Sequence, residues 1–324
     1  MKLAQKLFSG VVAATVALFS AGAAASTWPE RPIRLVVPFA PGGGTDIFTR
    51  VMAPRLSEVL GQQIVVDNKP GGSSIIGSQQ VVGATPDGYT LLVVDSSFMI
   101  NPSLRKDLPY DSQTDFVPIV HLASGPVILV VNPKVPANSL KELIDLAKSD
   151  PKALFYGSGG NGASTHLAGE LFKSVAGLSI EHVPFKGTGE ALTAVIAGQV
   201  PMTFTGISSA RGPVEDGRLR AIAVTGKERS AAMPNVPTFD EAGLANVNSS
   251  SQWGVYGPKG LPADVVTKIN AAFNEALKDP AVIERVKGLG YTLAGGSPQE
   301  FKAFTKEEMD KWGAIIKAAN ISIQ

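Results

Sequence analysis

The sequence contains no cysteine, so disulfide bonds cannot stabilise the folded chain and its hydrophobic core must do so alone. This excludes a small disulfide-rich scaffold and fits the 324 residues, which are enough for one large or two medium-sized domains. The chain has three histidines, His121, His166 and His182, and they are too scattered to resemble a metal site. We therefore expect no bound metal and no other cofactor.

Charged residues are also slightly scarce, at 18% of the chain, and 29 basic residues nearly balance 28 acidic ones. The sequence has neither a strong net basic charge nor a stripe of basic and aromatic residues, so we expect no nucleic-acid partner. Beyond residue 25, no segment reaches the run of about 18 apolar residues that is typical of a membrane span.

The first 25 residues differ in character from the rest of the chain. Lys2 and Lys6 precede an apolar stretch that ends in three alanines, Ala23–Ala25. A positive start, a short apolar segment and small residues at its end are typical of a secretory signal peptide. A retained membrane anchor is the alternative, and the short uninterrupted apolar part disfavours it. We expect residues 1–25 to be removed near Ala25 and the mature protein to lie in the periplasm.

One stretch combines a strand, a glycine-rich turn and a helix start. The apolar run at 33–37 is typical of a buried parallel strand, which Pro38 and Pro41 would end. Gly42–Gly44 follow, and Thr45 and Asp46 favour a helix start. Such a turn presents backbone N–H groups and the positive end of a helix dipole to an anion. For Asp46 two roles stay open, helix capping and contact with a ligand's amino group.

A second turn of the same kind spans residues 157–165, between a predicted strand and a predicted helix. Gly157, Gly159 and Gly162 match the G-x-G-x-x-G pattern of dinucleotide sites. However, Glu181 lies early in the next strand, whereas the acidic residue that binds a ribose lies at the strand end. The turn also lacks the lysine of a phosphate-binding P-loop. A general anion site remains, with a plain tight turn as the alternative.

Strands alternate with helices along the chain, which predicts parallel α/β sheets. Extended segments near 119–131 and 251–258 would carry the chain into a second lobe and back. We expect one lobe from residues 26–126 and 249–324 and the other from residues 127–248. The proline-rich segment 98–118 is expected to be mostly loop. The helices predicted after residue 262 are expected to pack on the first lobe.

A catalytic function has weak support in the sequence. The G-x-S-x-G motif of α/β hydrolases is absent. Ser164 lies two residues before His166, so an exported hydrolase or lyase that uses this pair is the alternative to a binding protein. We expect a binding protein and not an enzyme.

Several segments together resemble the periplasmic solute-binding proteins of tripartite tricarboxylate transporters, the Bug or TctC-like receptors. The similarity extends over nearly all of the expected mature chain. The segments that carry it are 28–33 (WPERPI), 41–46 (PGGGTD), 68–72 (NKPGG), 86–91 (PDGYTL), 157–167 (GSGGNGASTHL), 183–187 (VPFKG), 219–225 (LRAIAVT) and 236–243 (VPTFDEAG).

The resemblance implies a type II periplasmic-binding-protein fold, in which two α/β lobes close on a ligand in a central cleft. It implies that both glycine turns bind a small carboxylate through backbone N–H groups and that the protein, expected to be a monomer, passes this ligand to membrane subunits of a tripartite tricarboxylate transporter. The ligand would be a dicarboxylate or tricarboxylate, an amino acid or an aromatic acid. The residues expected at the ligand are Phe39, Gly43, Gly44, Thr45, Asp46, Ser96, Ser97, Ser158, Gly160, Asn161, Gly162, Ala163, Ser164, Thr165, Thr188, Thr205 and Gly206.

Overall fold

The computed structural model describes residues 28–247, 249–318 and 321. The chain divides into two compact units after Glu30, and the second unit contains the helices and strands of the described residues. The signal peptide predicted for residues 1–25 lies outside the described residues. Among those described, no helix is both long and apolar enough to cross a membrane.

The strands form one continuous sheet in the order β2-β1-β3-β9-β4-β7-β5-β6, and β8 and β10 also pair with β4. We call its two parts sheet A and sheet B. Sheet A contains the parallel strands β1 (Ile33–Val37), β2 (Ile64–Asn68) and β3 (Thr90–Val94), then antiparallel β9 (Ser250–Pro258) and β10 (Thr292–Gly295). Sheet B contains the parallel strands β5 (Phe155–Ser158), β6 (Glu181–Pro184) and β7 (Met202–Gly206), with β8 (Arg220–Val224) on β4.

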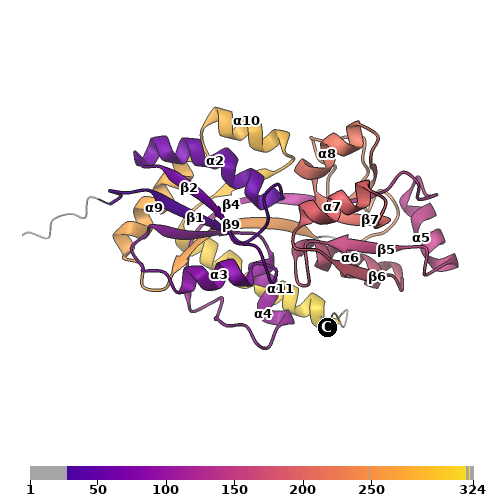
Figure 1. Cartoon of the computed structure of the whole chain (residues 1–324), viewed down its shortest axis with the longest axis horizontal. Coiled ribbons are helices and arrows are strands. Elements are labelled where there is room, and N and C mark those ends of the chain that lie inside the picture. The colour runs from indigo at the N-terminus through magenta and orange to yellow at the C-terminus, as the bar shows by residue number, and fades with distance from the viewer. Residues whose placement is uncertain (1–27, 248, 319–320, 322–324) are drawn as a thin grey trace, which may run out of the picture. The chain divides into compact units, whose positions relative to one another are not determined.

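The 16-residue strand β4 (Phe116–Val131) belongs to both sheets. Its first part pairs with β9 as far as Pro126, and its last part, from Val127, pairs with β7 and β8. The sequence predicted extended chain near residues 119–131, and in the structure it forms one strand that begins at Phe116. β4 and β9 therefore run between the strands around β1 and the strands around β5 (Figure 1).

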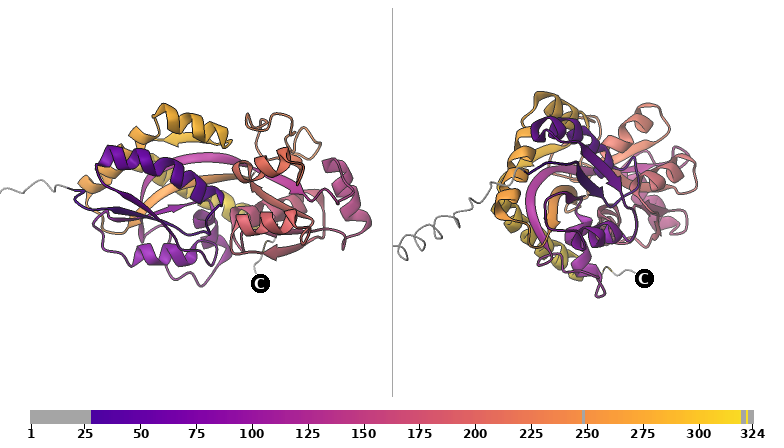
Figure 2. Two further views of the ribbon diagram at one scale, coloured as in Figure 1. Left: turned by 45° about the horizontal axis from the view of Figure 1, so that its top comes forward. Right: turned by 60° about the vertical axis from the view of Figure 1, so that its left-hand side comes forward.

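Helices follow the parallel strands and cover the sheets (Figures 1 and 2). The three C-terminal helices return to the N-terminal part: α9 and α10 pack on α2, and α11 packs on α4 and β4. The helices beside sheet A are α2 (Gly44–Leu60), α3 (Ile75–Val82), α4 (Ser97–Leu104), α9 (Ala263–Ala276), α10 (Pro280–Gly288) and α11 (Pro298–Ala318). In sheet B they are α5 (Leu140–Ser149), α6 (Ser164–Ala176), α7 (Thr188–Ile196) and α8 (Ile207–Glu215).

Hydrophobic cores lie on both faces of sheet B, because alternate residues of its strands point to opposite faces. On one face Tyr156, Phe172 and Phe204 are buried together, and on the other face Ile128 and Val130 are buried. The apolar runs of β1 and β3 are likewise almost fully buried. These cores hold the carboxyl ends of the parallel strands in fixed positions.

The prediction of loop for residues 98–118 is wrong at both ends, where helix α4 and the start of strand β4, at Phe116, lie. Pro102 lies inside α4 and cannot donate the backbone hydrogen bond that the carbonyl of Phe98 would normally accept. The hydroxyl of Ser112 donates to that carbonyl instead, at 3.4 Å. A non-local contact thus makes a proline-containing helix possible, which a local sequence pattern could not indicate.

Candidate ligand-binding site

The predicted site residues all lie where a parallel strand is followed by a helix. β1, β3, β5, β6 and β7 lead to helices α2, α4, α6, α7 and α8. The first N–H groups of each helix have no acceptor inside the helix, and the helix dipole makes this end positive. Ligands of parallel α/β sheets bind beyond the carboxyl ends of the strands. The arrangement is therefore suited to an anion bound by backbone groups of several helices.

Segments from the two sheets meet in this region. A Cβ placed on Gly43 would lie 3.8 Å from the hydroxyl oxygen of Thr188, and one placed on Gly187 would lie 3.3 Å from Cβ of Ala40. A Cβ on Gly159 would lie 3.1 Å from the backbone nitrogen of Thr188. The structure thus places both predicted glycine turns next to the start of α7.

Asp46 holds the first glycine turn in place. Its carboxylate accepts hydrogen bonds from the backbone nitrogen of Gly42 at 3.0 Å, from Arg50 at 3.0 Å and from Asn68 at 3.0 Å. Burial opposes ionisation, but the hydrogen bonds from Arg50, Gly42 and Asn68 outweigh it and lower the pKa of Asp46. Gly43 occupies the N-cap position, so Asp46 supports the helix start from inside its first turn. Contact between Asp46 and a ligand's amino group stays a prediction.

An aromatic group that the sequence did not single out lies beside Thr45. The indole nitrogen of Trp253 donates to the hydroxyl of Thr45 at 3.0 Å, and the ring of Trp253 lies 4.4 Å from that of Tyr291, centroid to centroid. Both aromatic side chains are buried. A Cβ on Gly44 would lie only 2.9 Å from the Tyr291 hydroxyl, so this position suits glycine.

The Tyr291 hydroxyl also reaches the other sheet. It shares a 2.5 Å hydrogen bond with Ser208 of α8, and a Cβ on Gly206 would lie 3.3 Å from it. Burial raises the pKa of Tyr291 to about 12, so the phenol stays protonated at neutral pH. Trp253 and Tyr291 thus lie against the predicted site residues Gly44, Thr45 and Gly206. An aromatic residue in a returning strand was the signal available in the sequence.

The second glycine turn satisfies several of its own backbone donors. Gly159 N–H donates to Thr165 Oγ1 at 3.0 Å, Gly160 N–H to Ser158 Oγ at 3.1 Å, and Gly162 N–H to His166 Nδ1 at 3.1 Å. Ala163 is the N-cap residue of α6, and its N–H donates to the carbonyl of Gly160. The donors left for an anion are then those of the first helical turn, which begins at Ser164.

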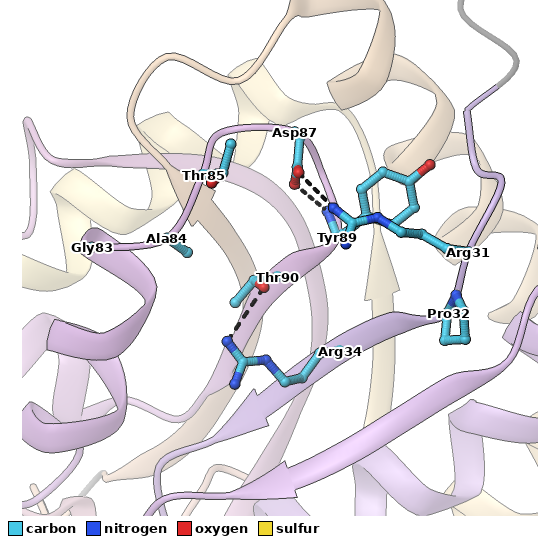
Figure 3. A pocket seen from close by; sticks show the side chains of 9 residues that line it. All are labelled: Arg31, Pro32, Arg34, Gly83, Ala84, Thr85, Asp87, Tyr89 and Thr90. Atoms are coloured by element: carbon cyan, nitrogen blue, oxygen red, sulfur yellow. Dashed lines mark hydrogen bonds and ion pairs between the residues drawn. The ribbon is translucent and has the colours of Figure 1, made fainter.

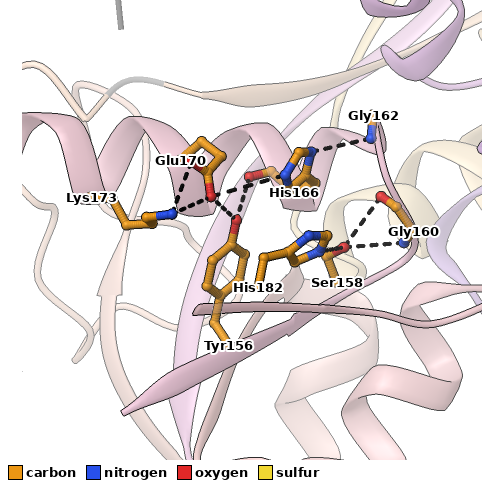
Figure 4. A network of polar contacts seen from close by, with 8 residues as sticks. All are labelled: Tyr156, Ser158, Gly160, Gly162, His166, Glu170, Lys173 and His182. Carbon is orange, nitrogen blue, oxygen red and sulfur yellow. Dashed lines mark hydrogen bonds and ion pairs between the residues drawn. The ribbon is translucent and has the colours of Figure 1, made fainter. Parts of the chain in front are cut away.

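Two histidines lie beside this turn, His166 buried and His182 half-buried (Figure 4). His166 must be neutral for Nδ1 to accept from Gly162, and burial, together with the charges of Lys173 and Arg105, lowers its pKa to about 4. His182 stacks on His166 at 4.1 Å between ring centroids and lies 2.6 Å from the hydroxyl of Ser158. Burial and the neighbouring His166 lower the pKa of His182 to about 3. Both imidazole rings are therefore uncharged at neutral pH and serve to hold the turn in place.

Ser164 and His166 do not form a nucleophile–base pair. The hydroxyl of Ser164 donates to the carboxylate of Asp95 at 3.0 Å, and Nδ1 of His166 is occupied by Gly162. Asp95 is buried at the end of β3, where its other oxygen accepts from Ser97 N–H at 2.9 Å. Burial raises the pKa of Asp95. The sequence placed Ser96 and Ser97 at the site but missed this carboxylate between them and Ser164.

The other predicted site residues differ in whether their polar groups are paired within the protein or line a cavity. The hydroxyl of Ser96 accepts from the backbone N–H of Gln252 at 2.8 Å, which ties β9 to the start of α4. The hydroxyl of Thr205 is buried and has no hydrogen-bond partner among the described residues. Phe39, Gly160 and Asn161 line a cavity of about 250 Å³. The hydroxyl of Ser97, another predicted site residue, is likewise buried without a partner among the described residues.

Another cavity, of about 470 Å³, lies at the opposite edge of sheet A, near the starts of β1 and β3 (Figure 3). Its two arginines are engaged by the protein. Arg31 pairs with Asp87 at 2.9 Å, and Arg34 contacts Asp67 and Thr90, each at 3.4 Å. This edge is away from the carboxyl ends of the strands, so we do not take it as the ligand site. Among the described residues no group of acidic and histidine side chains could hold a metal ion.

Comparison with known proteins places these features in a family. Residues 48–321 match the model of the tripartite tricarboxylate transporter family receptor. A UPF0065 protein in the tcbD-tcbE intergenic region of Pseudomonas sp. (strain P51) is 36% identical over 313 residues, which cover 96% of this chain and 93% of the relative.

Solved structures show the same similarity. The periplasmic binding protein BugD is 33% identical with a TM-score of 0.89, covering 92% of this chain and all of BugD. A protein of R. palustris, Rpa4515, solved with adipate, is 34% identical with a TM-score of 0.88, covering 91% of this chain and 99% of its own. The fold is thus the type II periplasmic-binding-protein fold with two α/β lobes, and the matched family is one of transporter receptors. The chain belongs to the tripartite tricarboxylate transporter receptor family.

Proposed function

We propose that this protein is a periplasmic receptor that captures a small carboxylate between its lobes and delivers it to the membrane subunits of a tripartite tricarboxylate transporter. The observation that carries the proposal is the convergence of helix starts from both sheets on one region, between Gly43 and Thr188. Such starts bind a carboxylate through N–H groups and need no basic side chain. The adipate bound to the R. palustris relative supports a carboxylate ligand.

The lobes would consist of residues 26–126 with 249–324 and of residues 127–248. The path of β4 supports these limits, because its pairing changes from β9 to β7 and β8 between Pro126 and Val127. Residues 1–25 would be the signal peptide, removed near Ala25, and the mature protein would act as a monomer.

The ligand carboxylate would bind to backbone donors of the first helical turns at Gly44–Asp46, at Ser164–Thr165 and at Thr188. The buried hydroxyl of Thr205 would add a side-chain contact. Backbone donors fixed by Asp46 and His166 cost little to order when the ligand arrives, because hydrogen bonds within each turn already hold it. Ligands without a carboxylate would leave these donors unpaired and bind weakly.

Ligand capture would work by a shift between open and closed forms. A ligand stabilises the closed form only if it contacts both lobes there. The proposed donors meet this condition. Gly44–Asp46 begin α2, which follows a strand of sheet A, whereas Ser164–Thr165 and Thr188 begin helices that follow strands of sheet B. A transporter subunit could then distinguish the loaded closed form from the open form.

A thermal-shift screen tests the proposal. The protein should be stabilised by at least one member of a panel of dicarboxylates, amino acids and aromatic acids, and not by neutral sugars or nucleosides. Thr205→Val should weaken binding of the active acid by about ten-fold, the effect of one lost hydrogen bond to a charged group. Thr267→Val, at an exposed position of α9, is the matched control. Binding of sugars or nucleosides with no response to any acid would contradict the proposal.

A further inference from the structure

A cavity of about 250 Å³ lies between sheet A and sheet B, next to the first glycine turn. One wall comes from Phe39, the turn at 71–73 and Arg105, which ends α4. The other wall comes from the glycine turn at 159–161 and from Phe185 and Lys186. The cavity therefore shares Phe39, Gly160 and Asn161 with the residues expected to bind the ligand.

The charged side chains that line this cavity are both positive. Arg105 and Lys186 line it, and no aspartate or glutamate is among the lining residues. In the described part of the chain, no ion pair joins either cation to a carboxylate. The carboxylate of Glu190 accepts from the backbone N–H of Lys186 at 3.2 Å, so the unbalanced positive charge is mainly that of Arg105. A cation without an ion pair, in a recess with low-dielectric walls, attracts an anion.

Arg105 has hydrogen-bonding capacity left for a ligand. Its Nη2 donates to the carbonyl of Asn161 at 3.1 Å, which joins the end of α4 to the second glycine turn. Its Nε is buried without a hydrogen-bond partner among the described residues. A guanidinium carries five N–H donors in a planar fork that matches a carboxylate. Nε exposes almost no surface and therefore does not face the cavity, so the N–H groups left for an anion are those of Nη1 and the second one of Nη2.

The position of Arg105 is itself fixed. Its backbone N–H donates to the carbonyl of Asn101 at 2.9 Å, and the Asn101 side chain donates to the carbonyl of Ser73 at 2.8 Å. The end of α4 is thereby tied to the turn that forms the same wall. A side chain on a fixed backbone loses less entropy when it binds a ligand.

We propose that Arg105, assisted by Lys186, forms a second anion subsite and selects ligands that carry a second acidic group. This inference rests on the proposed function, because the first carboxylate would be bound at the helix starts. Phe39 lines the cavity and leads directly to Gly43 and Gly44, so a short diacid would extend from the helix starts into the cavity. The second acidic group would accept from N–H groups of Nη1 and Nη2, beside the bond of Nη2 to Asn161.

Calorimetry with acid pairs of equal length tests the subsite. The probes are glutarate against pentanoate and adipate against hexanoate. At least one diacid should bind the unmodified protein ten-fold or more tightly than its monoacid, and Arg105→Gln should reduce this preference about ten-fold, since a charge-assisted hydrogen bond is lost. Monoacid affinity should hardly change. Lys186→Gln should reduce the preference by a smaller factor, because Lys186 is exposed.

Lys106→Gln is the matched control, since Lys106 is exposed, adjacent in sequence and outside the cavity lining. The melting temperature of each unliganded variant shows whether it folds. If Arg105→Gln weakened the binding of monoacids and diacids equally, Arg105 would have only a structural role and the subsite would be refuted. Equal binding of monoacids and diacids to the unmodified protein would refute the subsite alone. No binding of any acid would refute the proposed function as well.

Discussion

The hydroxyl of Ser164, at the start of α6, donates to the buried carboxylate of Asp95, at the end of β3, over 3.0 Å. The two residues are 69 positions apart and belong to different sheets. Asp95 also accepts from Ser97 N–H, so one carboxylate joins the starts of α4 and α6. A buried carboxyl group thus lies beside the helix starts that are proposed to bind the ligand.

Asp95→Asn should leave the protein as stable as before at pH 7.5, or more stable by on the order of 1 kcal/mol. The amide oxygen can accept from Ser97, the amide N–H can donate to Ser164, and the penalty for burying a charge is removed. Urea unfolding measures the change, and Asp216→Asn, at an exposed position, is the control. A loss of several kcal/mol for Asp95→Asn would mean that the charge itself stabilises the fold.

The raised pKa of Asp95 has a defined pH signature. The native state keeps the proton at pH values where the unfolded chain, with a pKa near 3.8, has lost it. Asp95 therefore makes stability fall as pH rises from about 3.8 through its native pKa, and makes no further difference above that value. The stability difference between Asp95→Asn and the unmodified protein should grow over this window and then stay constant.

His166 should make the protein sensitive to acid. Its pKa is about 4 in the folded state and 6.5 in the unfolded chain. Between these values the unfolded state binds more protons, so stability should fall as pH is lowered from 6.5 to 4. His182, with a pKa of about 3, should add to the effect. Urea unfolding at pH 7.5, 6, 5 and 4 should show the decrease, and constant stability over this range would contradict it.

The hydrogen bond from Gly162 to His166 can be tested separately. His166→Ala leaves the buried N–H of Gly162 unpaired, whereas an asparagine oxygen in His166→Asn can replace Nδ1. The alanine variant should be less stable than the asparagine variant by about 1–3 kcal/mol at pH 7.5. Equal stabilities would show that the second turn does not depend on this bond.

A larger residue at Gly44 should disturb Tyr291 beside the site. In Gly44→Ala the new Cβ would lie 2.9 Å from the Tyr291 hydroxyl, so Tyr291 must move and its bond to Ser208 weaken. We expect a loss of about 1–3 kcal/mol in stability, as in other overpacked sites, together with weaker ligand binding. Tyr291→Phe, which removes the clashing oxygen, should restore part of both in the double variant.

Gly212→Ala serves as control for this series, because a Cβ on Gly212 has no neighbour within 4 Å. That substitution lies in α8 and should leave ligand binding unchanged. If Gly44→Ala behaved like Gly212→Ala, the close approach of Tyr291 to Gly44 would not matter for the site.

The local parts of the site could be predicted from the sequence, and the non-local ones could not. An apolar run, prolines and glycines in that order predicted β1, the first turn and the start of α2, because each of these signals acts within a few residues. The contact of Trp253 with Thr45 spans 208 positions and depends on how β9 returns to sheet A. A local pattern contains no information about that return.

The sequence also could not show which backbone N–H groups of the second glycine turn remain free for a ligand. The pattern of the second turn predicted free backbone donors, but Gly160 and Gly162 donate to Ser158 and His166 in the folded chain. Which donors remain for a ligand depends on side-chain orientation, which spacing alone does not determine. The same holds for Asp95 and Arg105, whose roles follow from partners on the opposite sheet.

The central claim is that backbone donors at the helix starts bind a carboxylate. Titration calorimetry tests it most directly by comparing the tightest acid from the screen with its primary amide, which has the same shape and no charge. The acid should bind at least ten-fold more tightly than the amide, since hydrogen bonds to a charged acceptor are stronger than those to a neutral one. Equal affinity of acid and amide would contradict the claim.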